Sequence, residues 1–268
     1  MSRIRAVTVE LAWQLGRRRR ALVLWAIGLT AVAAIYVPLY PSIGGEQMQA
    51  LVDSLPAEMT AALGYDRLGS AAGYLTSTVF GLLGPALMLV FGIGLGARTI
   101  AGEEEAGELE LAAAAPVRRD DLLAGRVIAL HTQIAVLALV TFVASALLSA
   151  SVGLDITIGG IAAAALGLNL LVIAFATITL AAGAASGRRG VALAVGAGTA
   201  VAAFVADAVA GMLDDGAVLE ALSPFSWYLA TDPVVNGVPL VPYARLGVLT
   251  LIAWAVAHDR FRRRDLGV

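Results

Sequence analysis

The chain has 268 residues, of which 59% are hydrophobic and 14% are charged, with a mean hydropathy of +0.85 and a formal net charge of −2. This composition is far more apolar than that of soluble domains and predicts a membrane protein, in which the placement of charges matters more than their sum. All 18 basic residues are arginine and there is no cysteine, which excludes a P-loop lysine, a Schiff-base lysine, disulfides and thiol chemistry.

The first predicted element is an amphipathic helix over residues 1–20. Its apolar residues recur at spacings of three and four from Ile4 to Leu15, and the four arginines Arg17–Arg20 follow. A simpler interpretation is a basic anchor on anionic membrane lipids, and the two interpretations are compatible.

Six stretches approach the roughly 20 apolar residues that a helix needs to cross the hydrocarbon core. They predict an all-α membrane protein with six transmembrane helices in a single domain over residues 1–268. The sixth stretch is the weakest, because Arg245 interrupts it near one end. The predicted spans are 21–40, 75–97, 127–150, 156–185, 191–213 and 240–257.

The arginines predict the orientation of these spans. Sixteen of the 18 lie on one side of the predicted membrane, and only Arg67 and Arg245 lie on the other. By the positive-inside rule both termini are cytoplasmic. Because the alanine-rich, arginine-rich and lysine-free composition is typical of GC-rich bacterial genomes, we expect a multi-pass protein of the bacterial plasma membrane.

The cytoplasmic loop over residues 98–126 contains the sequence GEEEAGELELAAAAPVRR. Glu103, Glu104 and Glu105 suit the first turn of a helix, where the helix dipole favours carboxylates, and Pro116 suits its end. A helix of roughly a dozen residues is unstable alone, so it needs a partner surface. The alternative is a solvated loop whose charges keep it out of the bilayer.

This loop resembles the signature of type 2 ATP-binding-cassette exporter permeases. The matching pattern is Glu105-x-Gly107-x-Leu109-Glu110-Leu111, followed by Pro116-Val117-x-Arg119. Glu108, Ala112 and Ala113 depart from it. Weaker resemblances occur in the N-terminal segment, in LPAEMTAALGYDRLGSAAGYL before the second span, in SPFSWYLATDPVVNG within the outer loop 214–243, and in the terminal FRRRDLGV.

The resemblance implies that the loop is a coupling helix that seats in a groove of a separate cytoplasmic ATPase. The chain would then be a transport subunit and not an enzyme, and would bind no cofactor of its own, because ATP and Mg²⁺ would bind to the partner. Two ATPase copies and a second permease half, identical or related, would complete the exporter, with membrane lipids around it and no nucleic acid. The implied coupling residues are Glu103, Glu104, Glu105, Gly107, Leu109, Glu110, Leu111, Pro116 and Arg119.

Four polar residues within the spans are further candidates, because ionisable and polar groups at membrane depth are often functional. Asp207 and Arg245 lie at a similar outer level and could form a structural ion pair, which we favour over a substrate or proton site. Gln133 and Asn169 could line a route or bridge helices by hydrogen bonds. We expect no metal site, since His131 and His258 are isolated.

The glycines of the second span and the aromatic residues of the last outer loop have structural interpretations. Gly92, Gly94 and Gly96 would allow close helix packing. Phe225, Trp227 and Tyr228 would form either an interfacial belt or a short re-entrant turn.

Two other classes of function compete with the permease. An ion- or proton-coupled secondary transporter would work without an ATPase, but it would need several buried carboxylates, and only Asp207 is well inside a span. A membrane-embedded enzyme is less favoured, because no acid pairs or histidines converge in the sequence.

Overall fold

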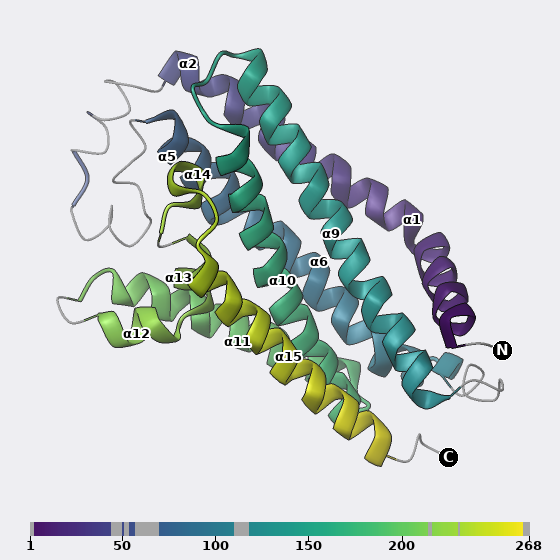
Figure 1. Ribbon diagram of the computed structural model, residues 1–268. Helices are drawn as coiled ribbons and strands as arrows, with labels where there is room; N and C mark the ends of the chain where they lie inside the picture. The colour runs from purple at the N-terminus through teal and green to yellow at the C-terminus, as the bar shows by residue number, and fades with distance from the viewer. Residues whose placement is uncertain are drawn as a thin grey trace.

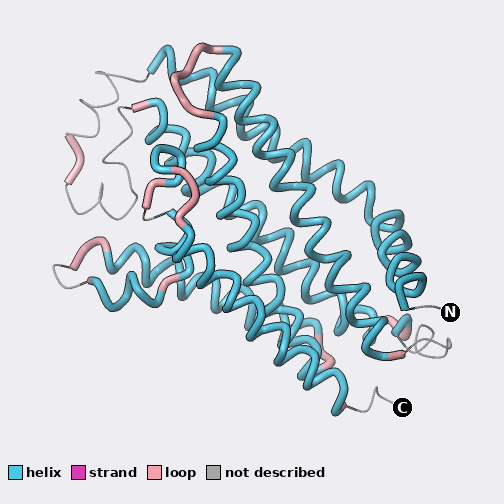
Figure 2. The backbone as a smooth tube through the Cα atoms, in the orientation of Figure 1, coloured by secondary structure: helices cyan, strands magenta, loops and turns pink. Residues whose placement is uncertain are grey.

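The chain folds into a bundle of long helices, which the computed structural model shows in Figures 1 and 2. Within the described residues there is no β-strand, and six helices are long and apolar enough to cross a membrane. The predicted all-α fold with six spans is therefore confirmed. The described residues are 3–43, 50, 54–56, 70–109, 118–213, 216–229 and 231–264.

Five of the spans are single helices and the second is a rod of five segments. The single helices are α1 (Arg3–Tyr36), α9 (Arg119–Ser151), α10 (Ile158–Ser186), α11 (Arg189–Ala210) and α15 (Leu240–Arg263). The rod consists of α5 (Ala71–Leu75), η3 (Thr76–Leu83), α6 (Gly84–Ala97), η4 (Arg98–Gly102) and α7 (Glu103–Glu105). The short elements are η1 (Val37–Leu39), α2 (Tyr40–Ile43), α12 (Ala217–Leu222), α13 (Pro224–Leu229) and α14 (Pro233–Asn236).

Helix α1 joins the predicted N-terminal segment to the first span without a break. Within its first half, Leu11, Gln14, Leu15 and Arg18 face inward, Glu10 is also partly buried, and residues 12, 13, 16 and 17 between them are exposed. This spacing of three and four residues is that of one helix face. Two of these four residues are polar, so the inward face of the segment makes polar contacts as well as apolar packing contacts.

The α-helical winding of the second span, Ala71–Glu105, is interrupted twice. The segments η3 and η4 on either side of α6 are π-helical, a winding that is rare and is frequently found at functional sites. In η3 the carbonyl of Phe80 accepts a hydrogen bond of 2.9 Å from the buried hydroxyl of Tyr228. The irregular winding thus provides an attachment point for a distant segment.

Helix α10 lies at the centre of the bundle and packs against α6, α9, α11 and α15, while α1 packs along α9. Two glycines of α6 permit the approach to α10. A methyl group at Gly92 would lie 2.6 Å from the side chain of Val172, and one at Gly96 would overlap the backbone carbonyl of Ala176. A methyl group at Gly94 would meet nothing within 4 Å. The predicted packing role therefore fits Gly92 and Gly96 but not Gly94.

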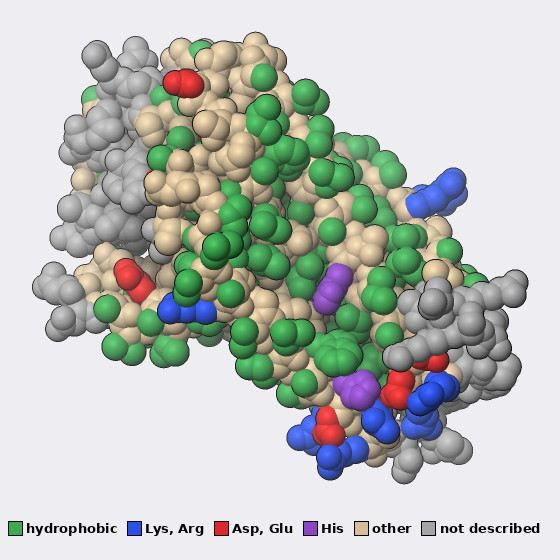
Figure 3. All heavy atoms as spheres, in the orientation of Figure 1, with side chains coloured by type: hydrophobic (Ala, Val, Ile, Leu, Met, Phe, Trp, Pro, Cys, Tyr) green, Lys and Arg blue, Asp and Glu red, His purple; other side chains and the backbone are tan. Residues whose placement is uncertain are grey.

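The charged residues of the described chain gather at one end of the bundle, which we call the arginine-rich end. In the view of Figure 3, blue and red side chains cluster at the lower right, and hydrophobic side chains cover the central face. The described chain begins and ends near this region (Figure 1). Its described arginines are Arg17–Arg20, Arg98, Arg118, Arg119, Arg126, Arg188, Arg189, Arg260 and Arg262–Arg264.

At the opposite end, the short helix α13 packs between α10, α11 and α15. Phe225 and Tyr228 are buried, and Phe225 packs against the rings of Phe175 and Phe204. Burial raises the pKa of Tyr228 well above its ordinary value, so its hydroxyl remains a neutral donor. Phe225 and Tyr228 thus belong to a short helix packed into the bundle, and the two interpretations of these aromatic residues, an interfacial belt or a re-entrant turn, remain predictions.

Candidate functional site: the charged network at the arginine-rich end

Glu103, Glu104 and Glu105 form the last turn of the rod that begins at Ala71. Gly107, with a φ of 71°, ends the helix in the left-handed conformation that favours glycine, and its N–H donates to the carbonyl of Glu104. The prediction that these glutamates begin a separate helix is therefore wrong. At the end of a helix the dipole disfavours carboxylates, so arginines must compensate for them.

The negative charge of Glu103 is compensated by two arginines. Its side chain is almost fully buried, and it forms an ion pair of 2.7 Å with Arg126 of α9. Gln14 of α1 donates a hydrogen bond of 3.0 Å to it, and Arg18 lies 3.8 Å away. Arg126 is itself only 2% exposed and also reaches Glu10 at 3.3 Å. One carboxylate thus joins the first, second and third spans.

Glu104 and Glu105 join the second span to the remaining helices. Arg264, directly after α15, forms an ion pair with Glu104 and donates a hydrogen bond of 3.0 Å to the carbonyl of Ala184 in α10. Glu105 accepts a hydrogen bond of 2.8 Å from the backbone N–H of Arg189, the first residue of α11. The three glutamates together therefore link the end of the second span to the other five spans.

The described part of the loop beyond Gly107 is also attached to the bundle. Glu108 accepts two hydrogen bonds from Arg17, of 2.6 and 2.8 Å, and this arginine holds the pKa of the Glu108 carboxyl below its ordinary value. Leu109 is fully buried in the hydrophobic core. Within this chain the side chain of Leu109 anchors the loop to the bundle, and its implied role as a contact to the ATPase remains a prediction.

The other implied coupling residues are only partly described. Glu110, Leu111 and Pro116 lie outside the described residues, so their roles remain predictions. Arg119 begins α9 and donates a hydrogen bond of 3.4 Å to the carbonyl of Arg264. Nothing in the described chain lies within 4 Å of a methyl group placed on Gly107, so the space beside this glycine is open, and its implied role in close approach of the ATPase remains a prediction.

Sequence reasoning missed the partners of the glutamates. Arg17, Arg18 and Arg126 were counted only as markers of orientation, and Glu10 and Gln14 were not singled out. The available signal was the coincidence of an acidic cluster with arginines near the ends of several spans on one side. Which arginine reaches which glutamate depends on how the helices pack, and the sequence does not specify this.

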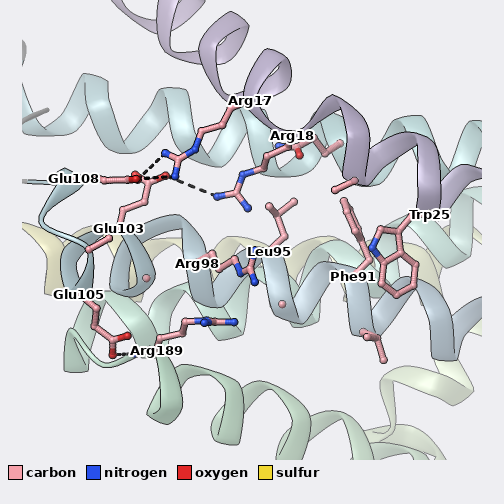
Figure 4. A pocket seen from close by; sticks show the side chains of 16 residues that line it. Arg17, Arg18, Trp25, Phe91, Leu95, Arg98, Glu103, Glu105, Glu108 and Arg189 are labelled. Carbon is pink, nitrogen blue, oxygen red and sulfur yellow. Dashed lines mark hydrogen bonds and ion pairs between the residues drawn. The ribbon is translucent and has the colours of Figure 1, made fainter.

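A cavity of about 710 Å³ lies beside the network, between α1 and the second span (Figure 4). Its polar part contains four arginines and three glutamates, and its apolar part includes Trp25 and Phe91. A second, apolar cavity of about 550 Å³ lies between α6 and α11. Val90 and Gly94 line both, so the two form a groove along α6 that changes from polar to apolar.

The predicted ion pair between Asp207 and Arg245 is wrong. Asp207 accepts a hydrogen bond from the hydroxyl of Ser226 in α13. The guanidinium of Arg245 is exposed and lies 6.0 Å from the ring centre of Trp227. The two side chains point to different neighbours because helix rotation, which position along the chain does not reveal, directs them apart.

Gln133 and Asn169 do not bridge helices through any hydrogen bond between described residues. Gln133 is 1% exposed, and its amide donates to the carbonyl of Ala129, one turn earlier in its own helix. The buried side-chain oxygens of Gln133 and Asn169 have no hydrogen-bond partner in the described chain. Gln133 lines the polar cavity, and its role in a substrate route remains a prediction.

Replacing Asp207 with alanine is expected to lower the free energy of unfolding by about 1–3 kcal/mol, because the buried hydroxyl of Ser226 loses its acceptor and α13 loses this hydrogen bond to α11. Asparagine, which keeps an acceptor, should lose less. Thermal unfolding in detergent measures the effect, and Arg245→Ala is the matched control. Unchanged stability with altered transport would place Asp207 in the substrate route instead.

Six long apolar helices, linked at one end of the bundle by buried ion pairs, define a multi-pass membrane protein. The chain belongs to the ABC-2 transporter family, since residues 12–266 match the family described as ABC-2 family transporter protein. It is therefore a membrane transport component, a permease of an ABC transporter, and this family generally works with a partner ATPase. Among curated proteins, no relative matches the chain.

Proposed function

We propose that this chain is the transmembrane subunit of an ATP-driven exporter, moved by a separate cytoplasmic ATPase that engages the segment after Gly107. The observation that supports this proposal most strongly is the network around Glu103. A force applied to the loop after the second span would reach α1 and α9 through Glu103, and α10, α11 and the tail of α15 through Glu104 and Glu105. A solvated loop would need no such attachment.

In this mechanism the arginine-rich end faces the cytoplasm, as the positive-inside rule predicts. ATP and Mg²⁺ bind to the partner, because this chain has no lysine with which to build a P-loop. Closure of two ATPase subunits pushes the two coupling loops. The rigid attachment at the arginine-rich end converts that push into a tilt of the spans, which switches access to the substrate route.

A second permease half, identical or related, would pack against the face formed by α1, α6 and α11. The apolar cavity between α6 and α11 opens on this face, and exposed apolar residues of α11 such as Val201 and Phe204 line it. Two facing grooves would enclose a route, and two-fold symmetry would close the assembly where the halves are identical.

Co-purification of the ATPase tests the proposal. Glu110→Arg should release the ATPase and abolish ATP-dependent transport in vesicles, because it reverses a charge in the proposed docking segment. Glu220→Arg makes the same change at an exposed position of α12 at the opposite end and should retain the ATPase. Transport by the purified chain with an ion gradient and no ATPase would overturn the proposal in favour of a secondary transporter.

A further inference from the structure

Three arginines from three different elements extend toward the polar cavity. Figure 4 shows Arg18 of α1, Arg98 of η4 and Arg189 of α11 around one space, with Trp25 and Phe91 at its other end. They are 80 or more residues apart in the sequence, and a methyl group placed on Gly102 would lie 3.4 Å from the side chains of both Arg98 and Arg189. The folded chain therefore concentrates positive charge where the bundle leaves room for a ligand.

The shortest contacts of the cavity's glutamates are with groups other than the guanidinium groups of these three arginines. Glu103 is paired with Arg126 and Glu108 with Arg17, while Glu105 accepts from the backbone N–H of Arg189. The guanidinium groups of Arg98 and Arg189 form no ion pair with a described carboxylate, and Arg18 has only the 3.8 Å contact with Glu103.

The buried Nε atoms of Arg18 and Arg189 also have no hydrogen-bond partner in the described chain. Buried donors of this kind are rare in folded proteins and need an acceptor. A phosphate group matches guanidinium geometry and accepts several hydrogen bonds at once.

Two further features of the cavity favour a ligand with a hydroxyl group and an apolar part over a simple anion. Gln133, 1% exposed, lines the cavity, and its Oε1 has no partner among the described residues, so a hydroxyl of the ligand could donate to it. Trp25 and Phe91, with ring centres 5.8 Å apart, form an apolar wall together with Val90 and Leu95. The cavity thus has an anionic part, a hydroxyl-accepting part and an apolar part.

We propose that this cavity binds an anionic phospholipid. Arg18, Arg98 and Arg189 hold its phosphate, Gln133 accepts from a headgroup hydroxyl, and an acyl chain lies along Trp25 and Phe91. Inorganic phosphate shares the headgroup chemistry but would leave the apolar wall without a partner. This binding does not depend on the proposed transport function, since the site lies within one chain.

Native mass spectrometry of the full-length chain, stripped of lipid and titrated with phosphatidylglycerol, tests the proposal. One phosphatidylglycerol per chain should be retained, and phosphatidylcholine should be retained far less. Each arginine removed should weaken retention about fivefold, from the roughly 1 kcal/mol that a basic residue contributes to binding an anionic lipid surface. The double variant R98Q/R189Q should therefore lose most of the bound lipid.

The matched control is R19Q/R20Q, which removes two exposed arginines of α1 that do not line the cavity. Equal losses in the two double variants, or equal retention of phosphatidylcholine, would overturn the proposal. Displacement of the lipid by millimolar inorganic phosphate would show a free-anion site and would also overturn it. If R98Q/R189Q does not fold, Arg98→Gln alone decides the question, because Arg98 is exposed and forms no ion pair with a described carboxylate.

Discussion

Replacing Glu103 with alanine is expected to lower the free energy of unfolding by about 3–5 kcal/mol, because it leaves a buried charge without its closest partner. Arg126 is 2% exposed, and after the change Glu10, at 3.3 Å, would be its remaining ion-pair partner among the described residues. The hydrogen bond from Gln14 would also be lost. Thermal unfolding of the purified chain in detergent measures the effect as a large fall in the midpoint temperature.

Glu108→Ala is the matched control, since it also removes a glutamate from an arginine pair. The side chains of Arg17 and Glu108 are 40% and 37% exposed, so this pair should contribute no more than about 1 kcal/mol. Combining Glu103→Leu with Arg126→Met should restore part of the lost stability, because buried ion pairs can often be replaced by apolar pairs of similar volume. Equal effects of Glu103→Ala and Glu108→Ala would contradict the central role of Glu103.

The double variant also tests whether Glu103 couples ATP hydrolysis to transport, separately from its effect on stability. Because Glu103 lies in the proposed path from the loop to α1 and α9, the double variant Glu103→Leu with Arg126→Met should bind the ATPase but couple ATP hydrolysis to transport poorly. An apolar pair packs the helices without the directional hydrogen bonds that transmit a push. Measurement of ATP hydrolysed per molecule transported, in vesicles that hold the permease and ATPase, distinguishes this outcome from simple loss of assembly.

The six spans could be predicted from the sequence because a bilayer demands long apolar helices, and this requirement is local. The sixth span tolerates Arg245 because its guanidinium is exposed at the end of the bundle opposite the arginine-rich end and lies 6.0 Å from the ring centre of Trp227. The end of the second span was harder to place. The glutamates look like the start of a helix by charge alone, but the rod continues to Glu105, and arginines from other helices compensate for the unfavourable dipole.

Contacts between distant helices could not be predicted. Arg126 lies 116 residues from Glu10, and only the packing of α1 along α9 brings them within 3.3 Å. The pairing of Asp207 with Arg245 was inferred from depth in the membrane, whereas the contacts of each side chain depend on the rotation of its helix. The sequence therefore specified where charge would concentrate and left the pairing of charges to the tertiary structure.

Alanine at Gly96 and at Gly94 should change the free energy of unfolding in opposite directions, although the two sites lie two residues apart in the same helix. At Gly96 the added methyl group overlaps the backbone carbonyl of Ala176, which cannot rotate away as a side chain can. Helices α6 and α10 must then separate, at a cost of about 1–3 kcal/mol. At Gly94 the methyl group meets open space, and the better helix propensity of alanine should add up to about 1 kcal/mol.

The comparison depends on helix geometry, because positions 92 and 96 share the face toward α10 and position 94 lies on the other side. Thermal unfolding of the two single variants decides it, and a fall in stability for both would show that α6 is packed on both faces. Since Gly94 lines both cavities, Gly94→Leu extends the test to function. It should leave the helix bundle intact and reduce transport, because the larger side chain would obstruct the groove where its polar and apolar parts meet.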